Sequence, residues 1–540
     1  MTDRWVWALL GIGIAVVYLL GLWVPVMNVD AAQYAVISAE MLHSGSYLQV
    51  TCRGLNYLDK PPLLFWLNTV AFRLFGISTA SYKFFSLLSV GVAVFSVYRL
   101  AADLYDRRTA LRAALLLATC QAFFLFANDV RTDALLTGMV TLAVWLLFRY
   151  GEHKKMVYLI AGSAAVGLAM LAKGPIGLVV PAAALGSHWL LQRRWQMFLH
   201  WPWLVGAAVI VVLLAPMTYG LYRQFGMEGV RFFFWTQSFG RITGESPWRN
   251  DAGFFYFWGE LLWAYLPWTF WVLAALMAQV NELLRHRLAR NALPEAISLG
   301  GFLLPFIALS FSQFKLSHYV FVVFPLAAVF TAAGSVRMER SPRLWRLMLA
   351  LQALVLLCML IGTGILNLTY FPVQRTVLWL PVLLFLAAAT VIALRMRKVP
   401  EWIFYSAALV AVAVNFLMNT NVYPQLVRYQ AGLPIAERLK ERNWDTLNLS
   451  YLDYHDYALE FYLGRSLPWY DRATLDSLLA EGRPMVVIGR DSARALLQRA
   501  GSRVQSVDTL FNHSVTRLSL DFLNPRTRSQ TLEPVYMIRF

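Results

Sequence analysis

The stretch WVWALLGIGIAVVYLLGLWVPV, from Trp5 to Val26, decides the fold class of this chain. It is apolar throughout and long enough to cross a hydrocarbon core about 30 Å thick. It also lacks the small-residue cleavage pattern of a removable signal peptide. We therefore expect a first membrane span, or signal anchor, near the N-terminus.

The composition extends this conclusion to the whole chain. Hydrophobic residues make up 59% of the 540 residues and charged residues only 14%, too few to cover the surface of a soluble protein of this size. This excludes a soluble enzyme, a disordered scaffold and a fibrous protein. Cys52, Cys120 and Cys358 are far apart, so they indicate neither a metal site nor a disulfide framework.

Further apolar runs predict an α-helical polytopic membrane protein with about thirteen transmembrane helices. The N-terminal stretch is the first of these thirteen helices. Each further run has the length of a span or of a short membrane helix. The other runs lie at approximately residues 82–103, 110–127, 133–150, 156–172, 175–191, 201–220, 254–280, 296–313, 317–335, 345–367, 376–394 and 402–420.

The formal net charge of +17 is distributed in short clusters between these runs, as in cytoplasmic loops under the positive-inside rule. The rule places the N-terminus in the cytoplasm, and the loops 27–81 and 221–253 and the C-terminal segment outside. A nucleic-acid-binding protein would gather its basic residues on one polar face, so no nucleic-acid partner is expected. The clusters lie at residues 107–108, 154–155, 193–194, 285–290, 337–346 and 395–398.

From Tyr423 onward the composition changes to that of a soluble module. Helix-like stretches at 433–441, 473–481 and 491–500 alternate with strand-like stretches at 447–452, 485–488 and 535–538, which predicts a small α/β domain. It contains no Gly-rich phosphate loop and no nucleophile elbow, which favours a cap or docking domain. We predict a membrane domain over 1–422, with its first periplasmic loop at 27–81, and a periplasmic domain over 423–540.

The first outer loop carries the most informative polar residues. Asp30 follows the first span directly and Tyr34 begins a helical pattern, so an interfacial helix is expected there. Tyr57 precedes Asp59 and Lys60, which stand before two prolines on a stiff turn. Taken singly, Asp30 fits a helix cap equally well, and Asp59 and Lys60 fit a solvated ion pair.

Later loops add cations on the same predicted side of the membrane. Arg131 and Asp133 stand at the start of one run, Lys173 lies between two runs, and Lys315, His318 and Tyr319 begin another. Lysine beside a span is costly and suggests function. Arg241, flanked by small and aromatic residues, is a candidate for phosphate or sugar contact. An outward-facing cationic pocket fits an anionic ligand that arrives through the membrane, such as a lipid phosphate.

The motifs described above occur together, and in this order, in one protein family. The sequence resembles the membrane-embedded GT-C glycosyltransferases that use polyprenyl-phosphate sugar donors, and within them the lipid A aminoarabinose transferase and the dolichyl-phosphate-mannose protein mannosyltransferase relatives. The resemblance covers roughly residues 1 to 340. It is carried by Asp30, Tyr57-Leu58-Asp59-Lys60-Pro61-Pro62, Arg131-Thr132-Asp133-Ala134-Leu135-Leu136, Lys173-Gly174-Pro175 and Phe314-Lys315-Leu316-Ser317-His318-Tyr319.

The resemblance implies a GT-C fold and a set of site roles. Asp30 would be the catalytic or acceptor-positioning carboxylate, and Asp133 the acidic residue of the second loop. Asp59 would occupy a position where the aminoarabinose transferase carries a metal ligand. The remaining candidates are donor-phosphate contacts at Lys60, Arg131, Lys173, Arg241, Lys315 and Tyr319, and cavity residues at Tyr34, Tyr57 and His318.

The sequence also departs from the family pattern. Ala31 follows Asp30 where the family often has a glutamate, and Gln237 and Ser238 stand where the aminoarabinose transferase pattern has an acidic residue and a histidine. The second departure weakens the case for zinc, so the sequence specifies no particular cofactor and leaves a divalent metal at Asp59 open.

The resulting hypothesis is a bacterial inner-membrane glycosyltransferase with a periplasmic active site. It would transfer a sugar by inverting displacement from undecaprenyl phosphate to lipid A, another glycolipid, a polysaccharide or a protein. The expected partners are this donor, a lipid or glycan acceptor and membrane lipids; the oligomeric state is left open. The alternatives are a protein O-mannosyltransferase-like enzyme, a transporter or flippase for lipid-linked sugars, and an inactive assembly subunit.

Overall fold

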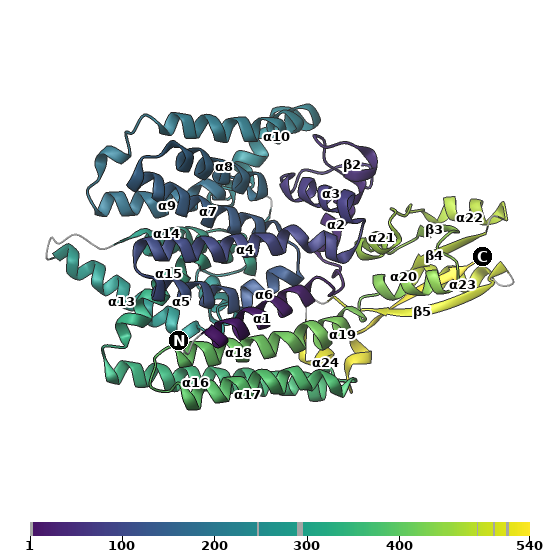
Figure 1. Cartoon of the computed structure of the whole chain (residues 1–540). Coiled ribbons are helices and arrows are strands. Elements are labelled where there is room, and N and C mark those ends of the chain that lie inside the picture. The colour runs from purple at the N-terminus through teal and green to yellow at the C-terminus, as the bar shows by residue number, and fades with distance from the viewer. Residues whose placement is uncertain (1–3, 246–247, 289–294, 483, 501–502, 515–517) are drawn as a thin grey trace.

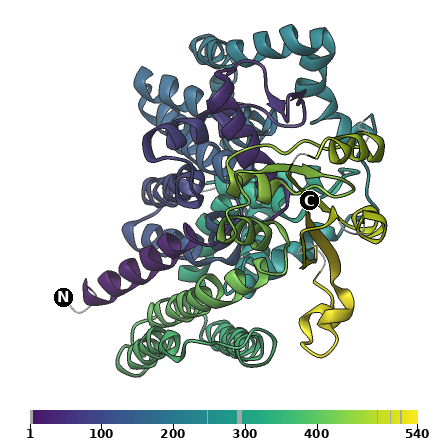
Figure 2. The same cartoon turned by 90° about the vertical axis from the view of Figure 1, so that its right-hand side faces the viewer.

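The computed structural model describes residues 4–245, 248–288, 295–482, 484–500, 503–514 and 518–540. Part of the basic cluster at 285–290 therefore lies outside the described residues. A bundle of long helices occupies most of the molecule, and the C-terminal strands gather at one end of it (Figure 1). Figure 2 looks onto that end, with the C-terminal sheet in front of the bundle.

Long apolar helices make this chain a multi-pass membrane protein. Within the described ranges, nine helices are long and apolar enough to cross a membrane. The pair α5 (Arg107–Thr119) and α6 (Gln121–Asn128), bent by 51°, could form a tenth span. The nine are α1 (Arg4–Gly21), α4 (Thr79–Leu104), α7 (Thr132–His153), α8 (Met156–Lys173) and the segments Trp203–Thr236, Ser317–Met338, Pro342–Tyr370, Thr376–Arg395 and Trp402–Val427.

The predicted number of about thirteen spans is not confirmed. Two of the predicted runs form helices shorter than a usual span, α9 (Ile176–Leu191) and α14 (Ile297–Ser310). The prediction of a single span over 254–280 was wrong. The structure divides this run into two helices, α12 (Tyr256–Ala264) and α13 (Thr269–Leu288). Pro267 lies between them, and proline has no N–H to continue a helical ladder.

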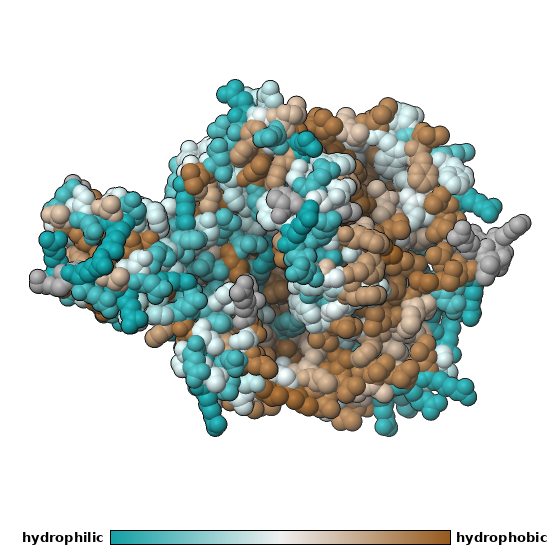
Figure 3. All heavy atoms as spheres, turned by 180° about the vertical axis from the view of Figure 1, so that it is seen from behind, coloured by the Kyte–Doolittle hydropathy of each residue, from teal (hydrophilic) through white to brown (hydrophobic). Residues whose placement is uncertain are grey.

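The surface is consistent with a membrane-embedded bundle. On the face shown in Figure 3, hydrophobic side chains gather over much of the helical part of the molecule, while hydrophilic ones gather over the C-terminal part and at the rim of the other end. An apolar band between two polar ends is the distribution that a bilayer selects.

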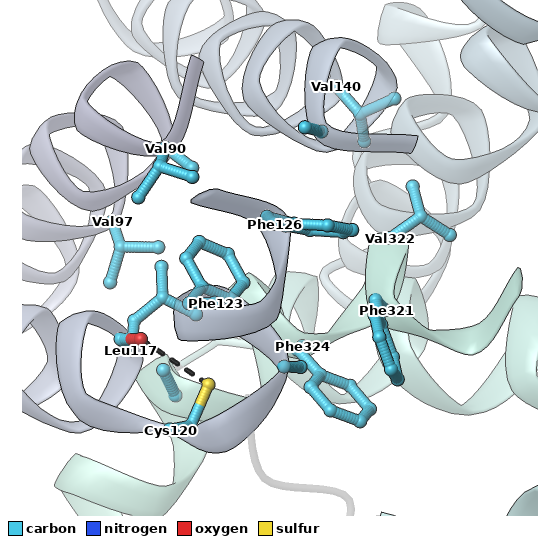
Figure 4. Packing of buried hydrophobic residues seen from close by; sticks show 14 of the residues in the cluster. Val90, Val97, Leu117, Cys120, Phe123, Phe126, Val140, Phe321, Val322 and Phe324 are labelled. Atoms are coloured by element: carbon cyan, nitrogen blue, oxygen red, sulfur yellow. Dashed lines mark hydrogen bonds between the residues drawn. The ribbon is translucent and has the colours of Figure 1, made fainter. Parts of the chain in front are cut away.

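The bend between α5 and α6 is packed into the centre of the bundle. Cys120 has extended backbone angles at the bend, and its thiol donates to the carbonyl of Leu117 at 3.3 Å. Phe123 and Phe126 point from α6 into a buried cluster that includes Phe324 (Figure 4). This packing fixes the direction of α6, so the residues that follow it, from Asp129 onward, reach one end of the bundle.

The first outer loop folds into two helices and a small hairpin. The predicted interfacial helix is α2 (Asp30–Ser44), with Tyr34 and Met41 buried, followed by β1 (Thr51–Cys52), β2 (Leu55–Asn56) and α3 (Leu63–Phe75). Glu40 holds the hairpin turn, since its carboxylate accepts from the backbone N–H of Arg53 at 2.6 Å and of Gly54 at 3.0 Å.

The C-terminal segment contains a four-stranded sheet in the order β3-β4-β6-β5. β3 (Asn448–Tyr451) runs parallel to β4 (Met485–Gly489), while β6 (Glu533–Arg539) is antiparallel to both β4 and β5 (Ser506–Asn512). The predicted strands correspond to β3, β4 and β6, whereas β5 was not predicted. The predicted helices correspond to α20 (Gly432–Glu441), α22 (Arg472–Ala480) and α23 (Asp491–Ala500).

Helix α21 (Tyr457–Leu463) joins this segment to the first outer loop. Glu460, whose side chain is fully buried, pairs with Arg53 at 2.7 Å, and the Arg53 guanidinium lies 4.2 Å from the centre of the Tyr457 ring. The Tyr462 hydroxyl accepts from the backbone N–H of Val26 at 2.7 Å. The C-terminal segment therefore contacts the loop that carries Asp30.

Candidate functional site

A pocket with a cationic wall lies where the first outer loop meets the membrane helices. Lys60 enters it from the first loop, Lys173 from the end of α8, and Arg241 from α11 (Gly240–Thr243). The opposite wall is apolar and is formed by α9 and α14. The residues that line it are Lys60, Pro61, Leu136, Lys173, Pro175, Ile176, Val179, Gln237, Ser238, Phe239, Arg241, Pro305, Ala308, Leu309, Ser312 and Tyr319.

Tyr319 lies between two of these cations. Its hydroxyl accepts a hydrogen bond from Nη1 of Arg241 at 2.6 Å, and the Lys173 ammonium lies 3.9 Å from the centre of its ring. Arg241 is buried, and its Nε has no hydrogen-bond partner among the described residues. The Arg241 guanidinium lines the pocket, where its charge can pair with an anionic ligand.

Asp133 lies behind the cationic wall rather than in the lining of the pocket. Its buried carboxylate accepts from Lys173 Nζ at 2.5 Å through Oδ1, and His318 Nε2 lies 3.7 Å from Oδ2. The carboxylate fixes the Lys173 ammonium and compensates its charge. His318 therefore lies beside the ion pair that Asp133 forms with Lys173.

Asp30 and Arg131 form a second charged group. Oδ2 of Asp30 accepts from Arg131 Nη1 at 3.0 Å, and Asp129 accepts from Arg131 Nε at 2.6 Å. Burial alone would lower the pKa of Arg131, but the two carboxylates outweigh it and raise the pKa above its usual value. Asp30 is the first residue of α2, after the N-cap residue Val29, and its half-exposed carboxylate pairs with Arg131.

Tyr57 has a buried hydroxyl in the same loop as Lys60. Burial raises the pKa of the Tyr57 hydroxyl, and the charges of Asp59 and Asp30 raise it further. This buried hydroxyl has no hydrogen-bond partner in the part of the chain that the structure describes. It lines a small cavity together with Lys60, and it is therefore available to a ligand at the Lys60 turn.

Asp59 does not fit a metal site. Oδ2 of Asp59 accepts from Lys60 Nζ at 2.7 Å, and Oδ1 accepts from Gln237 Nε2 at 3.1 Å. No group of three or more histidine, cysteine or carboxylate side chains within the described ranges could hold a metal ion. A single carboxylate that is already paired with an ammonium is a poor ligand set for a divalent cation.

Lys315 and Tyr34 belong neither to the pocket lining nor to the ion pairs described above. Lys315 is buried, and its ammonium donates to the carbonyl of Ala252 at 2.7 Å. Its backbone N–H also donates to Oδ1 of Asn250 at 3.1 Å, which ties the 250–252 loop to this segment. Tyr34 is buried against Phe65, with ring centres 6.0 Å apart, in the core of the first outer loop. Burial raises the pKa of the Tyr34 hydroxyl.

Gln237 and Asp129 also belong to the site, although neither was a predicted site residue. Gln237 lines the pocket and holds Asp59, a role that the sequence signals only through its place four residues before Arg241. Asp129 completes the ion pairs of Arg131, and its signal is the spacing Asp129-Val130-Arg131. The apolar wall from α9 and α14 had no sequence signal, because it depends on how two distant helices pack.

Over part of its length the chain is similar in sequence to known proteins. Residues 59–219 match the family described as dolichyl-phosphate-mannose-protein mannosyltransferase. The chain is 29% identical over 338 residues to the undecaprenyl phosphate-alpha-4-amino-4-deoxy-L-arabinose arabinosyl transferase of Pseudomonas aeruginosa strain UCBPP-PA14. It is 30% identical over 357 residues to the transferase of the same name from Pseudomonas paraeruginosa. These matches cover 61% and 64% of this chain, and 59% and 62% of the relatives' lengths.

The fold is also similar to solved structures. The crystal structure of ArnT from Cupriavidus metallidurans bound to undecaprenyl phosphate aligns with a TM-score of 0.76 at 21% identity, covering 100% of this chain and 98% of that one. The apo form of the same protein aligns with a TM-score of 0.73 at 20% identity, covering 98% and 97%. The chain therefore has the GT-C fold. The resemblance to the aminoarabinose transferase type, predicted from the sequence, is confirmed by these relatives.

Proposed function

We propose that this chain is an integral membrane glycosyltransferase that transfers a sugar from undecaprenyl phosphate to an envelope acceptor such as lipid A, another glycolipid or a polysaccharide. The observation that carries the proposal is the pocket in which Lys60, Lys173 and Arg241 face an apolar wall from α9 and α14. Such a pocket matches a donor that has a phosphate at one end and a prenyl chain at the other.

In this proposal the cations hold the donor phosphate. Breaking the bond between the sugar and the phosphate develops negative charge on the phosphate oxygen that leaves, and fixed cations stabilise that charge as it forms. Lys173 and Arg241 are held in place by Asp133 and Tyr319, so they need little reorganisation during the reaction. The prenyl chain would lie along Ile176, Val179 and Leu309.

Asp30 is the proposed acceptor-side carboxylate. An acceptor oxygen attacks the anomeric carbon, the carbon–oxygen bond to the phosphate breaks, and its electron pair leaves on the phosphate, which inverts the sugar carbon. Where the acceptor is a hydroxyl, its proton passes to Asp30. Oδ2 of Asp30 is engaged by Arg131, while Oδ1 has no hydrogen-bond partner among the described residues and is free to accept that proton.

The other predicted site residues receive roles from their contacts. Asp133 was predicted to be catalytic, but its burial behind Lys173 favours a role in positioning that ammonium. Arg131 would orient Asp30. Lys315, bonded to Ala252, would contribute to the phosphate site mainly by fixing the 250–252 loop near Arg241. No step is assigned to a metal at Asp59.

The proposed orientation follows the distribution of basic residues. The N-terminus would lie in the cytoplasm of a bacterial cell, with the pocket and the segment 423–540 in the periplasm. That segment would form an α/β domain that closes over the first loop, because α21 already contacts it through Glu460 and Arg53. The shorter helices α9 and α14 would count among about thirteen membrane helices.

The test uses the purified full chain in detergent with radiolabelled undecaprenyl-phosphate sugars. Lipid A, total envelope glycan and a periplasmic protein extract are offered separately, to wild type and to Asp30→Asn. We expect label to enter one acceptor and to be lost in the variant, while donor binding persists. Transfer to protein alone would favour the protein O-mannosyltransferase-like alternative.

Two outcomes would contradict the proposal. The first is the absence of transfer to every acceptor while the labelled lipid binds and crosses proteoliposomes, which would favour a transporter. The second is transfer at an unchanged rate in Asp30→Asn, which would remove Asp30 from the reaction. As a matched control, Asp106→Asn alters an aspartate that caps α5 away from the pocket, and it should leave transfer unchanged.

A further inference from the structure

A second charged cavity lies at the other end of the bundle from the Lys60 pocket. Arg4 begins α1, while Arg107, Arg108 and Arg112 lie in the first turns of α5. Both α1 and the α5–α6 pair end at residues that lead into the Asp30 and Arg131 group, so their first turns stand at the opposite end. The cavity is lined by Arg4, Trp7, Arg107, Arg108, Leu111, Arg112, Leu115, Glu401, Phe404 and Tyr405.

The charges of this cavity do not balance. Glu339 and Glu401 both pair with Arg108 and with Arg112, so two carboxylates compensate two guanidiniums. Arg4 and Arg107 are exposed and form no ion pair with a described residue. Among the described residues that line the cavity or pair with its arginines, two positive charges are therefore in excess.

The environment of Arg112 is a further observation that favours a ligand in this cavity. Its side chain is 2% exposed, and Nη1 and Nη2 are bonded to Ser335, Glu339 and Glu401. Its Nε has no hydrogen-bond partner among the residues that the structure describes, although Arg112 lines the cavity. Arg112 thus lines the cavity with one N–H unpaired, and the excess of positive charge around it favours an anionic ligand over water.

The rest of the cavity wall fits a lipid. Trp7, Leu111 and Leu115 give it an apolar side, and the Phe404 ring lies 4.2 Å from the Arg112 guanidinium carbon. One wall is α1, which has exposed apolar side chains such as Ile12, Val16 and Leu19. A ligand with a phosphate and acyl chains could therefore reach the arginines from the bilayer, along α1.

We propose that this cavity binds the phosphate of an anionic phospholipid, with its acyl chains along α1. Basic pockets between membrane helices are recognised sites for anionic head groups. The proposal does not depend on the transferase activity, because it concerns the opposite end of the bundle from the donor pocket. A bound lipid would fill the groove between α1 and α5 and join α1 to the bundle.

The test counts bound lipids by native mass spectrometry of the purified full chain in detergent. Dioleoyl phosphatidylglycerol is titrated against dioleoyl phosphatidylcholine, with inorganic phosphate in a separate series. We expect preferential binding of the anionic lipid by wild type. The double variant Arg4→Ala/Arg107→Ala should weaken it about thirtyfold, at about fivefold for each charge near the surface. Arg107→Lys, which keeps the charge, should retain most of the binding.

Two control variants test whether the loss of lipid binding is specific to the arginines of this cavity. Arg340→Ala/Arg343→Ala removes two exposed arginines from the same end outside the cavity, and Lys60→Ala removes a cation from the donor pocket; neither should change the anionic lipid's affinity. Equal binding by wild type and Arg4→Ala/Arg107→Ala would overturn the proposal. So would a loss of equal size in Arg340→Ala/Arg343→Ala, or inorganic phosphate that displaces the lipid as effectively as free lipid does.

Discussion

The Tyr319 hydroxyl accepts a 2.6 Å hydrogen bond from Arg241, and this bond links the start of the Ser317–Met338 span to the loop that follows α10 (Trp203–Arg231). The same ring lies beside the Lys173 ammonium, so one aromatic side chain sets the positions of two cations from different segments. The cationic wall of the pocket therefore depends on a residue that itself carries no charge.

Replacing Tyr319 by phenylalanine should weaken donor binding while the fold persists. The change keeps the ring beside Lys173 but removes the acceptor for Arg241, and a hydrogen bond to a charged group contributes about 1.5–3 kcal/mol. We expect at least a tenfold higher KM for the lipid-linked donor, measured in the transfer assay. Tyr256→Phe, which removes a hydroxyl bonded to Ser317 outside the pocket lining, is the control. Equal effects of the two changes would contradict the role of Tyr319.

Breaking the pair between Asp133 and Lys173 should cost stability as well as activity. Asp133→Asn leaves a largely buried ammonium without its carboxylate, a change that typically costs about 3–5 kcal/mol. The double change Asp133→Leu/Lys173→Met should recover much of that stability but not the transfer activity. Thermal unfolding in detergent, together with the transfer assay, separates the two effects. Recovery of activity in the double variant would show that the charges are structural only.

Arg53→Ala should loosen the contact between α21 and the first loop, and the effect should depend on pH. Burial raises the pKa of Glu460 above its usual value, and Arg53 opposes this, so the variant raises it further. A carboxyl group with a raised pKa contributes stability that is present at low pH and is lost as pH rises through that pKa. Arg53→Ala should therefore be most destabilising at neutral pH and less so near pH 4.5.

Hydrogen exchange of α21 at both pH values measures this prediction. The control is Arg442→Ala, which breaks the more exposed pair with Asp508 inside the C-terminal segment and should leave exchange in α21 unchanged. Exchange in α21 that is equally slow in wild type and Arg53→Ala at neutral pH would contradict the prediction.

Gly177→Ala should disturb the apolar wall of the pocket. A Cβ at this position would lie 2.6 Å from backbone atoms of Ala169 and Met170, so α9 would have to move away from α8. Overpacking of this kind costs about 1–3 kcal/mol, and here it displaces Ile176, which lines the pocket. Gly91→Ala in α4 meets nothing within 4 Å and should be neutral. Donor affinity and thermal unfolding of the two variants provide the comparison.

The amino-acid sequence by itself determined the membrane class, the positions of the apolar runs and the group of residues at the site. Apolar length and charge distribution act locally, so runs such as Trp5 to Val26 could be recognised without any partner. The motifs around Lys60, Lys173 and Tyr319 were recognisable for the same reason, and the structure brings these three residues to one pocket.

The different roles of these residues follow only from the tertiary structure. The sequence treated Asp30 and Asp133 alike, but one is half exposed beside Arg131 and the other is buried behind Lys173. It contained no sign that Arg53 pairs with Glu460, which is 407 residues away, or that Arg4 and Arg107 share a cavity. Such contacts depend on how distant helices pack, and no local pattern of residues records that packing.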